Sequence, residues 1–174
     1  GAGPQGFSDR TWRFDPDTGA FTELAVDGPT ARYDAARVVL PDGDLLLVSG
    51  MQGDGEFDSE VWRFDVETET WAEIPATSSA PPGRRVPFVA LSEDGERLYM
   101  GFGSDHPRGA TVKQDLWVFE LSTGVWTRTE RPDGAPAGRG FAMAWEGPTD
   151  SLGVLAFGVD GDLRLHEDAF VLRE

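Results

Sequence analysis

Cysteine is absent from the 174-residue sequence, and lysine occurs once, at Lys113. The lack of cysteine excludes disulfide bonds, zinc–thiolate sites, iron–sulfur clusters and thiol nucleophiles. Basic residues are few, because 15 Lys and Arg stand against 31 Asp and Glu, which gives a formal net charge of −16. A chain of this charge repels nucleic acid and anionic membranes, so a function that depends on neutralising phosphates is excluded.

Long apolar runs are also absent. No stretch approaches the roughly 18–20 consecutive apolar residues of a membrane-spanning helix. The first ten residues have neither the basic nor the apolar region of a signal peptide, and the compartment stays undetermined. Turn-forming and aromatic residues are abundant instead, with 22 Gly, 12 Pro, six Trp and eleven Phe. We therefore expect one soluble, turn-rich, all-β domain over residues 1–174.

A repeat of about 50 residues runs through the chain. Its clearest element is a short strand that begins with a large aromatic residue, found at Trp12, Trp62, Trp117 and Phe170. These equivalent positions are separated by 50, 55 and 53 residues. In the first three copies a turn and a second aromatic strand follow, so the element predicts a β-hairpin.

A second element recurs in step with the first. A short Pro-containing segment ends in an arginine, at Arg32, Arg84 and Arg139. Each is followed by an apolar strand, a turn rich in Gly, Pro and Asp, and another apolar strand that ends in small residues. Each full repeat thus contains four short strands, and the repeat units cover residues 7–26, 33–76, 86–130 and 140–173.

These residues resemble the kelch repeat, a β-propeller blade of about 50 residues. In three copies the aromatic pair is separated by seven residues: Phe14 and Phe21, Phe64 and Trp71, Phe119 and Trp126. The Gly-Gly pair of the family is degenerate, standing as Ser49-Gly50, Gly101-Phe102 and Phe157-Gly158. The resemblance implies four-stranded antiparallel blades of a propeller. Another propeller family or a β-sandwich is the alternative.

The repeat count predicts a partial propeller. Propellers usually have 4–8 blades, whereas 174 residues supply about three and a half. An open array leaves a bare blade face and unpaired strand edges. We therefore expect closure either by self-association, most simply as a homodimer, or by blades on a second polypeptide.

The recurring arginines suggest two roles. Arg32, Arg84 and Arg139 can form a cationic ring that binds a carboxylate or sulfate. Alternatively, each pairs with an acidic residue of the next blade, at Glu60, Asp115 or Asp168, and this second reading is the favoured one. Arg85 breaks the pattern and is a further ligand-binding candidate, the better outlier to test.

The longer loops within the blades supply the remaining candidates, Asp105, His106 and His166. The carboxylates of Asp54, Glu56 and Asp58 have a spacing that suits Ca²⁺, but the glycine and distal glutamate of an EF-hand are missing, so no cofactor is expected. The sequence lacks a Gly-x-Ser-x-Gly motif and a phosphate loop, and without cysteine it cannot supply the copper site of galactose-oxidase-like kelch enzymes.

Three functions are compatible with the sequence. The first is a non-catalytic binding or assembly module that presents loops or a channel face to a protein or glycan partner, as the kelch resemblance implies. The second is an enzyme resembling kelch-type sialic-acid mutarotases, in which an arginine holds an anionic sugar and an acidic residue moves a proton. The third is a structural subunit of a larger assembly.

Overall fold

The computed structural model describes residues 1–4, 6–106, 111–130, 133–145 and 153–173. Their regular secondary structure is β-strand throughout, and every pair of neighbouring strands is antiparallel. The predicted all-β fold with antiparallel blades is thereby confirmed. Over the same residues, no helix suited to crossing a membrane is found.

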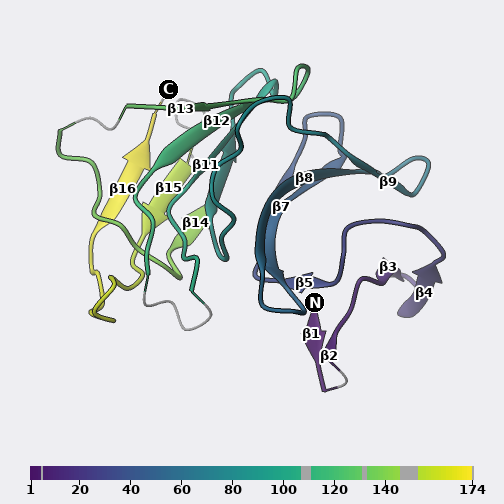
Figure 1. The fold of residues 1–174 in the computed structure, drawn as a ribbon. Helices are drawn as coiled ribbons and strands as arrows, with labels where there is room; N and C mark the ends of the chain where they lie inside the picture. Colours follow the sequence, from purple (N-terminus) through teal and green to yellow (C-terminus); the bar gives the residue numbers. More distant parts are fainter. Residues whose placement is uncertain (5, 107–110, 131–132, 146–152, 174) are drawn as a thin grey trace.

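Three sheets follow one another across the molecule in chain order (Figure 1). Blade 1 contains β5 (Arg32–Tyr33), β6 (Ala36–Val39), β7 (Leu45–Gln52), β8 (Phe57–Asp65) and β9 (Thr70–Glu73). Blade 2 contains β10 (Phe88–Leu91), β11 (Arg97–Gly101), β12 (Leu116–Glu120) and β13 (Val125–Arg128). Blade 3 contains β14 (Met143–Trp145), β15 (Gly153–Ala156) and β16 (Ala169–Leu172).

Two hairpins precede blade 1. The hairpin of β3 (Thr11–Asp15) and β4 (Ala20–Leu24) is the first copy of the repeated hairpin and corresponds to the third and fourth strands of a blade; we call it the first hairpin. A shorter hairpin, β1 (Ala2–Gly3) and β2 (Gly6–Phe7), is not predicted by the sequence. It lies beside β5 at the lower edge of blade 1 (Figure 1), where the Phe7 and Tyr33 rings are 5.1 Å apart.

The repeated turn between the last two strands of a unit has a clear local cause. In the first hairpin, Asp15 Oδ1 accepts a hydrogen bond from the backbone N–H of Asp17, and Gly19 adopts a φ of 71°. The equivalent residues are Glu69 and Gly124, with φ values of 54° and 69°. A left-handed residue is needed here, and glycine adopts this conformation without the steric cost that Glu69 has.

Each blade has one face toward the preceding part of the chain and one toward the following part, and blade 2 packs against a blade on both sides. We call these the leading and the trailing face. Between blades 1 and 2, small aliphatic side chains of the blade 1 trailing face (Val38, Leu46, Val48 and Val61) meet the blade 2 leading face (Leu98, Met100, Phe119 and Trp126). Between blades 2 and 3, Phe88, Ala90 and Phe102 meet Leu155. Most of the described apolar core therefore lies between sheets rather than within one.

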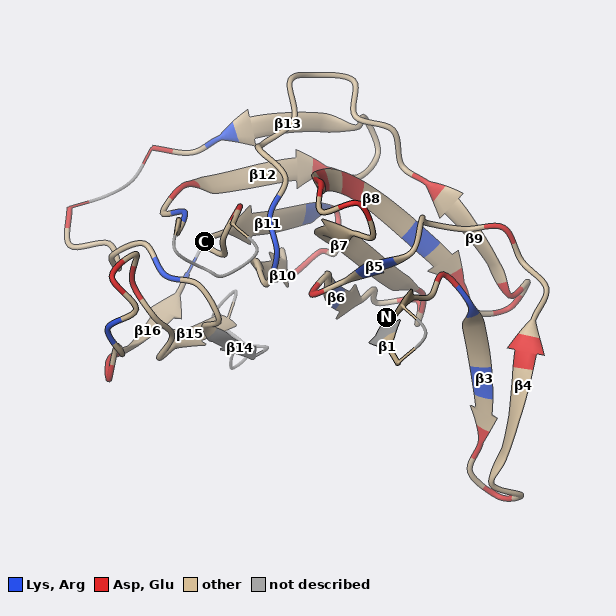
Figure 2. Cartoon of the chain, turned by 60° about the horizontal axis from the view of Figure 1, so that its bottom comes forward, with Lys and Arg blue, Asp and Glu red and all other residues tan. Residues whose placement is uncertain are grey.

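The charged residues have a different distribution. Acidic residues lie mainly in the turns and at strand ends, whereas much of each strand is uncharged (Figure 2). This arrangement keeps the repelling charges of a −16 chain in solvent. Arginines also occur within strands (Figure 2). The arginines of the site described next lie in or just before the first strand of each blade.

Candidate functional site

The three recurring arginines are buried, and each is ion-paired within its own blade. Arg84 Nη1 and Nη2 donate to Asp115 Oδ1 and Oδ2 at 2.6 and 3.0 Å. Arg139 Nη1 donates to Asp168 Oδ1 at 2.7 Å. The predicted partners are therefore correct, but the expectation that they belong to the next blade is wrong. The reason is that each arginine lies in or just before the first strand of its sheet, and each acid lies in or just before the strand that pairs with the next-to-inner strand of the same sheet, at β8, β12 or β16.

Backbone carbonyls complete each arginine site. Arg84 Nε donates to Pro82 O at 3.1 Å, and Nη1 donates to Phe102 O at 3.0 Å. The equivalent bonds recur for the other two arginines. Phe102 has a φ of 56°, and the equivalent residues Ser49 and Phe157 are left-handed as well. These conformations turn the carbonyls toward the guanidinium groups, so the buried cations are satisfied by the chain itself.

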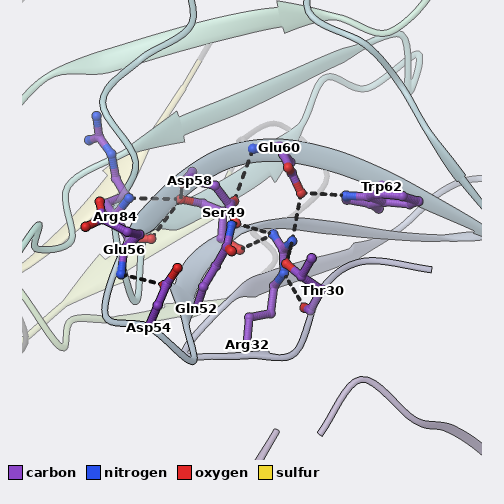
Figure 3. A network of polar contacts seen from close by, with 10 residues as sticks. All are labelled: Thr30, Arg32, Ser49, Gln52, Asp54, Glu56, Asp58, Glu60, Trp62 and Arg84. Atoms are coloured by element: carbon purple, nitrogen blue, oxygen red, sulfur yellow. Dashed lines mark hydrogen bonds and ion pairs between the residues drawn. The ribbon is translucent and has the colours of Figure 1, made fainter. Parts of the chain in front are cut away.

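Blade 1 differs because its arginine has two acidic partners (Figure 3). Arg32 Nη2 lies 2.7 Å from Glu60 Oε2, and Arg32 Nη1 lies 2.7 Å from Asp58 Oδ2. Asp58 also accepts a hydrogen bond from Gln52 Nε2 at 2.9 Å. Trp62 Nε1 donates to Glu60 at 2.9 Å, as Trp117 Nε1 does to Asp115 at 2.7 Å.

The second acid changes the local electrostatics. Burial raises the pKa of Asp58, and the neighbouring charge of Glu60 raises it further, against the opposing effects of Gln52 and Arg32. Burial also disfavours the charged form of Asp115, but hydrogen bonds from Arg84 and Trp117 and the charge of Arg84 lower its pKa to about 2. Burial also opposes the charged form of Glu60, but hydrogen bonds from Trp62 and Arg32 outweigh burial and lower the pKa of Glu60, so in blade 1 it is Asp58 whose charged form is disfavoured.

Arg85 forms the centre of a stack across three blades. Its guanidinium carbon lies 5.0 Å from the Tyr33 ring centroid and 4.9 Å from that of Phe141, and Nη2 pairs with Asp34. With Phe7 against Tyr33, the order is Phe7, Tyr33, Arg85, Phe141. We call these four residues the inner-end stack. The sequence analysis identified Arg85 but missed the three rings, because contacts between repeats have no local signal.

A cleft adjoins this stack. Its volume is about 290 Å³, and its lining includes Thr11, Asp34, Leu47 and Trp71 together with Tyr33. It lies between the first hairpin and blade 1, which both contribute lining residues. The cleft therefore gives a ligand access to Asp34 and Tyr33 from one side of the stack.

The loop candidates are not gathered at the stack. Asp105 pairs with Lys113, and the backbone N–H of His106 donates to Ser104 Oγ at 3.1 Å; residues 107–110 of this loop lie outside the described residues. His166 belongs to blade 3, with Nδ1 at 4.0 Å from Asp168 Oδ1. Asp58 is committed to Arg32, and within the described ranges no group of three or more His, Cys, Asp or Glu is placed to hold a metal ion.

Comparison with known proteins places these features in context. Residues 1–172 match the family model described as the KLHDC2/KLHL20/DRC7 Kelch-repeats domain. Two curated relatives from Arabidopsis thaliana are acyl-CoA-binding domain-containing proteins 4 and 5. The first is 28% identical over 127 residues (72% of this chain, 18% of the relative) and the second 30% identical over 102 residues (59% and 15%). The chain thus spans less than a fifth of either relative.

A solved structure supports the fold. The structure of YjhT, a kelch-type propeller protein, superposes with a TM-score of 0.67 and 14% sequence identity. The superposition covers 91% of this chain and 54% of that chain. At this identity the match concerns the fold alone.

Proposed function

This chain belongs to the kelch-repeat family, and we propose that it is a non-catalytic binding module whose inner-end stack and adjoining cleft contact a protein or glycan partner. The observation that carries the proposal is the stack itself. Arg85 is held between two rings from different blades, and Phe141 at its end is 42% exposed. Exposed aromatic rings beside a fixed polar group are typical of binding surfaces.

The distribution of the other charged groups supports a non-catalytic role. Arg32, Arg84 and Arg139 have acidic partners and backbone carbonyls inside their blades, so they serve the fold. A ligand-binding role for these three would require breaking a buried ion pair, which costs several kcal/mol. The stack and cleft need no such rearrangement to receive a partner.

The test compares two exposed apolar side chains. Phe141→Ala removes the open end of the stack, whereas Val39→Ala removes a side chain of similar exposure on β6. A glycan array and quantitative affinity capture with natural-source extract are performed with the wild type and both variants. We expect any specific ligand to be lost with Phe141→Ala, by tenfold or more, and retained with Val39→Ala. Equal retention by both variants would contradict the proposal.

An enzyme acting on an anionic sugar is the second candidate, because Asp34 lines the cleft and pairs with Arg85. A cation beside a carboxylate can hold a sugar acid while the carboxylate moves a proton. Anomer interconversion of a sialic acid, followed by NMR, tests this candidate. Acceleration by the wild type that disappears in Asp34→Asn would favour catalysis over simple binding.

A further inference from the structure

The large apolar side chains at the two ends of the blade array are exposed, although their equivalents inside the array are buried. On the leading face of the first hairpin, Phe14 is 51% and Phe21 66% exposed. The equivalent residues of blade 2, Phe119 and Trp126, are 0% and 4% exposed because the trailing face of blade 1 covers them. The first hairpin therefore presents an aromatic face that lacks the cover found in blade 2.

The trailing face of blade 3 is exposed as well. Phe157 is 47% and Val171 51% exposed. Phe102, equivalent to Phe157, is 4% exposed and packs in the same cluster as Leu155 of the next blade. Blade 3 thus exposes a trailing face, and the equivalent face of blade 2 is packed against the leading face of the next blade.

The interior junctions indicate what covers each end. At both interior junctions a leading face packs against a trailing face: the blade 2 rings meet aliphatic side chains of blade 1, and Leu155 of blade 3 meets Phe88 and Phe102 of blade 2. The chain exposes one face of each kind. It also superposes on 54% of the YjhT chain.

We propose that two copies of this chain associate head to tail, with the trailing face of blade 3 in one copy packed on the leading face of the first hairpin in the other. The contact repeats the packing between blades 1 and 2, and strand pairing between copies is not required. Exposed apolar patches of this kind usually mark interaction surfaces. The net charge of −16 on each copy opposes association, so added salt strengthens it by screening the repulsion.

The test uses size exclusion with light scattering, in high salt, on the wild type and three lysine variants. Phe21→Lys disrupts the leading face and Val171→Lys the trailing face. Val66→Lys is the matched control, because Val66 is 50% exposed in the turn between β8 and β9 and belongs to neither face. We expect a mass of at least twice 18.9 kDa for the wild type and the control, and 18.9 kDa for each face variant.

Mixing the two face variants distinguishes a head-to-tail contact from a contact between two identical faces. Phe21→Lys keeps an intact trailing face and Val171→Lys an intact leading face, so the mixture restores a dimer through one contact. Circular dichroism of each variant alone checks that it is folded. A monomeric wild type, a face variant that keeps the wild-type mass, or a mixture that stays monomeric would each overturn the proposal. These masses do not depend on the inner-end stack, so they leave the proposed ligand function to its own test.

Discussion

Blades 1 and 2 contain the same repeat, but their surroundings differ. Blade 2 lies between two blades, whereas blade 1 is preceded by the β3–β4 hairpin, which has only the two outer strands of a blade. Leu98 on the leading face of blade 2 is 0% exposed, and Leu45 at the equivalent position of blade 1 is 36% exposed. A leucine at this position therefore contributes more to stability in blade 2, where the preceding blade buries it, than in blade 1.

The polar contacts of the two blades differ because different residues stand at equivalent positions. Arg84 has one carboxylate partner and Arg32 has two. Trp71 Nε1 of blade 1 donates to Thr11 Oγ1 of the first hairpin at 2.9 Å. Trp126 of blade 2 meets Val61 at the position equivalent to Thr11, and its buried Nε1 has no hydrogen-bond partner among the described residues. Repeats therefore tolerate local exchange of polar partners while keeping the sheet geometry.

Removing the single acidic partner in blade 2 should have the largest effect. Asp115→Ala leaves the buried Arg84 guanidinium without a carboxylate, which should lower the free energy of unfolding by about 3–5 kcal/mol. Glu60→Ala should cost clearly less, because Asp58 remains 2.7 Å from Arg32. Urea denaturation of both variants measures the difference. Equal losses would show that the second carboxylate does not compensate.

The next effect concerns cover by the preceding blade. Leu98→Ala should lower the free energy of unfolding by about 2–5 kcal/mol, through lost burial and a residual cavity. Leu45→Ala should cost less than about 1 kcal/mol, since part of its side chain already contacts water. The pair is compared by guanidinium denaturation at low protein concentration. A large loss for Leu45→Ala would indicate that its face is covered in solution.

A smaller gain should follow from supplying the missing partner of Trp126. Val61→Thr places a hydroxyl where Thr11 serves Trp71, and the new hydrogen bond should stabilise the chain by about 1 kcal/mol. Thr11→Val should cost a similar amount. Melting temperatures of both variants test the pair. A loss in Val61→Thr would mean that burying the hydroxyl outweighs the new bond.

The smallest effect concerns Asp58 and is clearest as a function of pH. Because its pKa is raised in the folded state, ionised Asp58 opposes folding, and stability increases as pH falls through that pKa. Asp58→Asn should remove this dependence and raise stability at neutral pH by about 1 kcal/mol or less. Denaturation between pH 3 and pH 7 measures it.

Asp115 should affect the pH dependence of stability in the opposite direction. Its pKa is lowered to about 2, so its contribution is fully present above its ordinary value of 3.8 and is lost as pH falls toward 2. Asp115→Asn should therefore weaken the acid-induced loss of stability. If both asparagine variants changed the profile in the same direction, the assigned difference between the two arginine sites would be wrong.

The sequence alone determined the repeat, and through it the strands. The spacing of Trp12, Trp62 and Trp117, the aromatic pairs and the Gly-, Pro- and Asp-rich turns predicted the hairpins, and the structure places them in antiparallel blades. Pairing of Arg84 with Asp115 and of Arg139 with Asp168 was also accessible, because those residues recur together. Local and periodic signals of this kind survive in a single sequence because each repeat solves the same packing problem.

Only the tertiary structure decided which blade supplies each partner and which faces are covered. The assignment of the acids to the next blade failed because residues 31 positions apart, such as Arg84 and Asp115, meet within one sheet through its register. The stack of Tyr33, Arg85 and Phe141, and the exposure of Phe21 and Val171, have no periodic signal at all. They depend on how sheets stack, and that packing is fixed by contacts distant in sequence rather than by local preference.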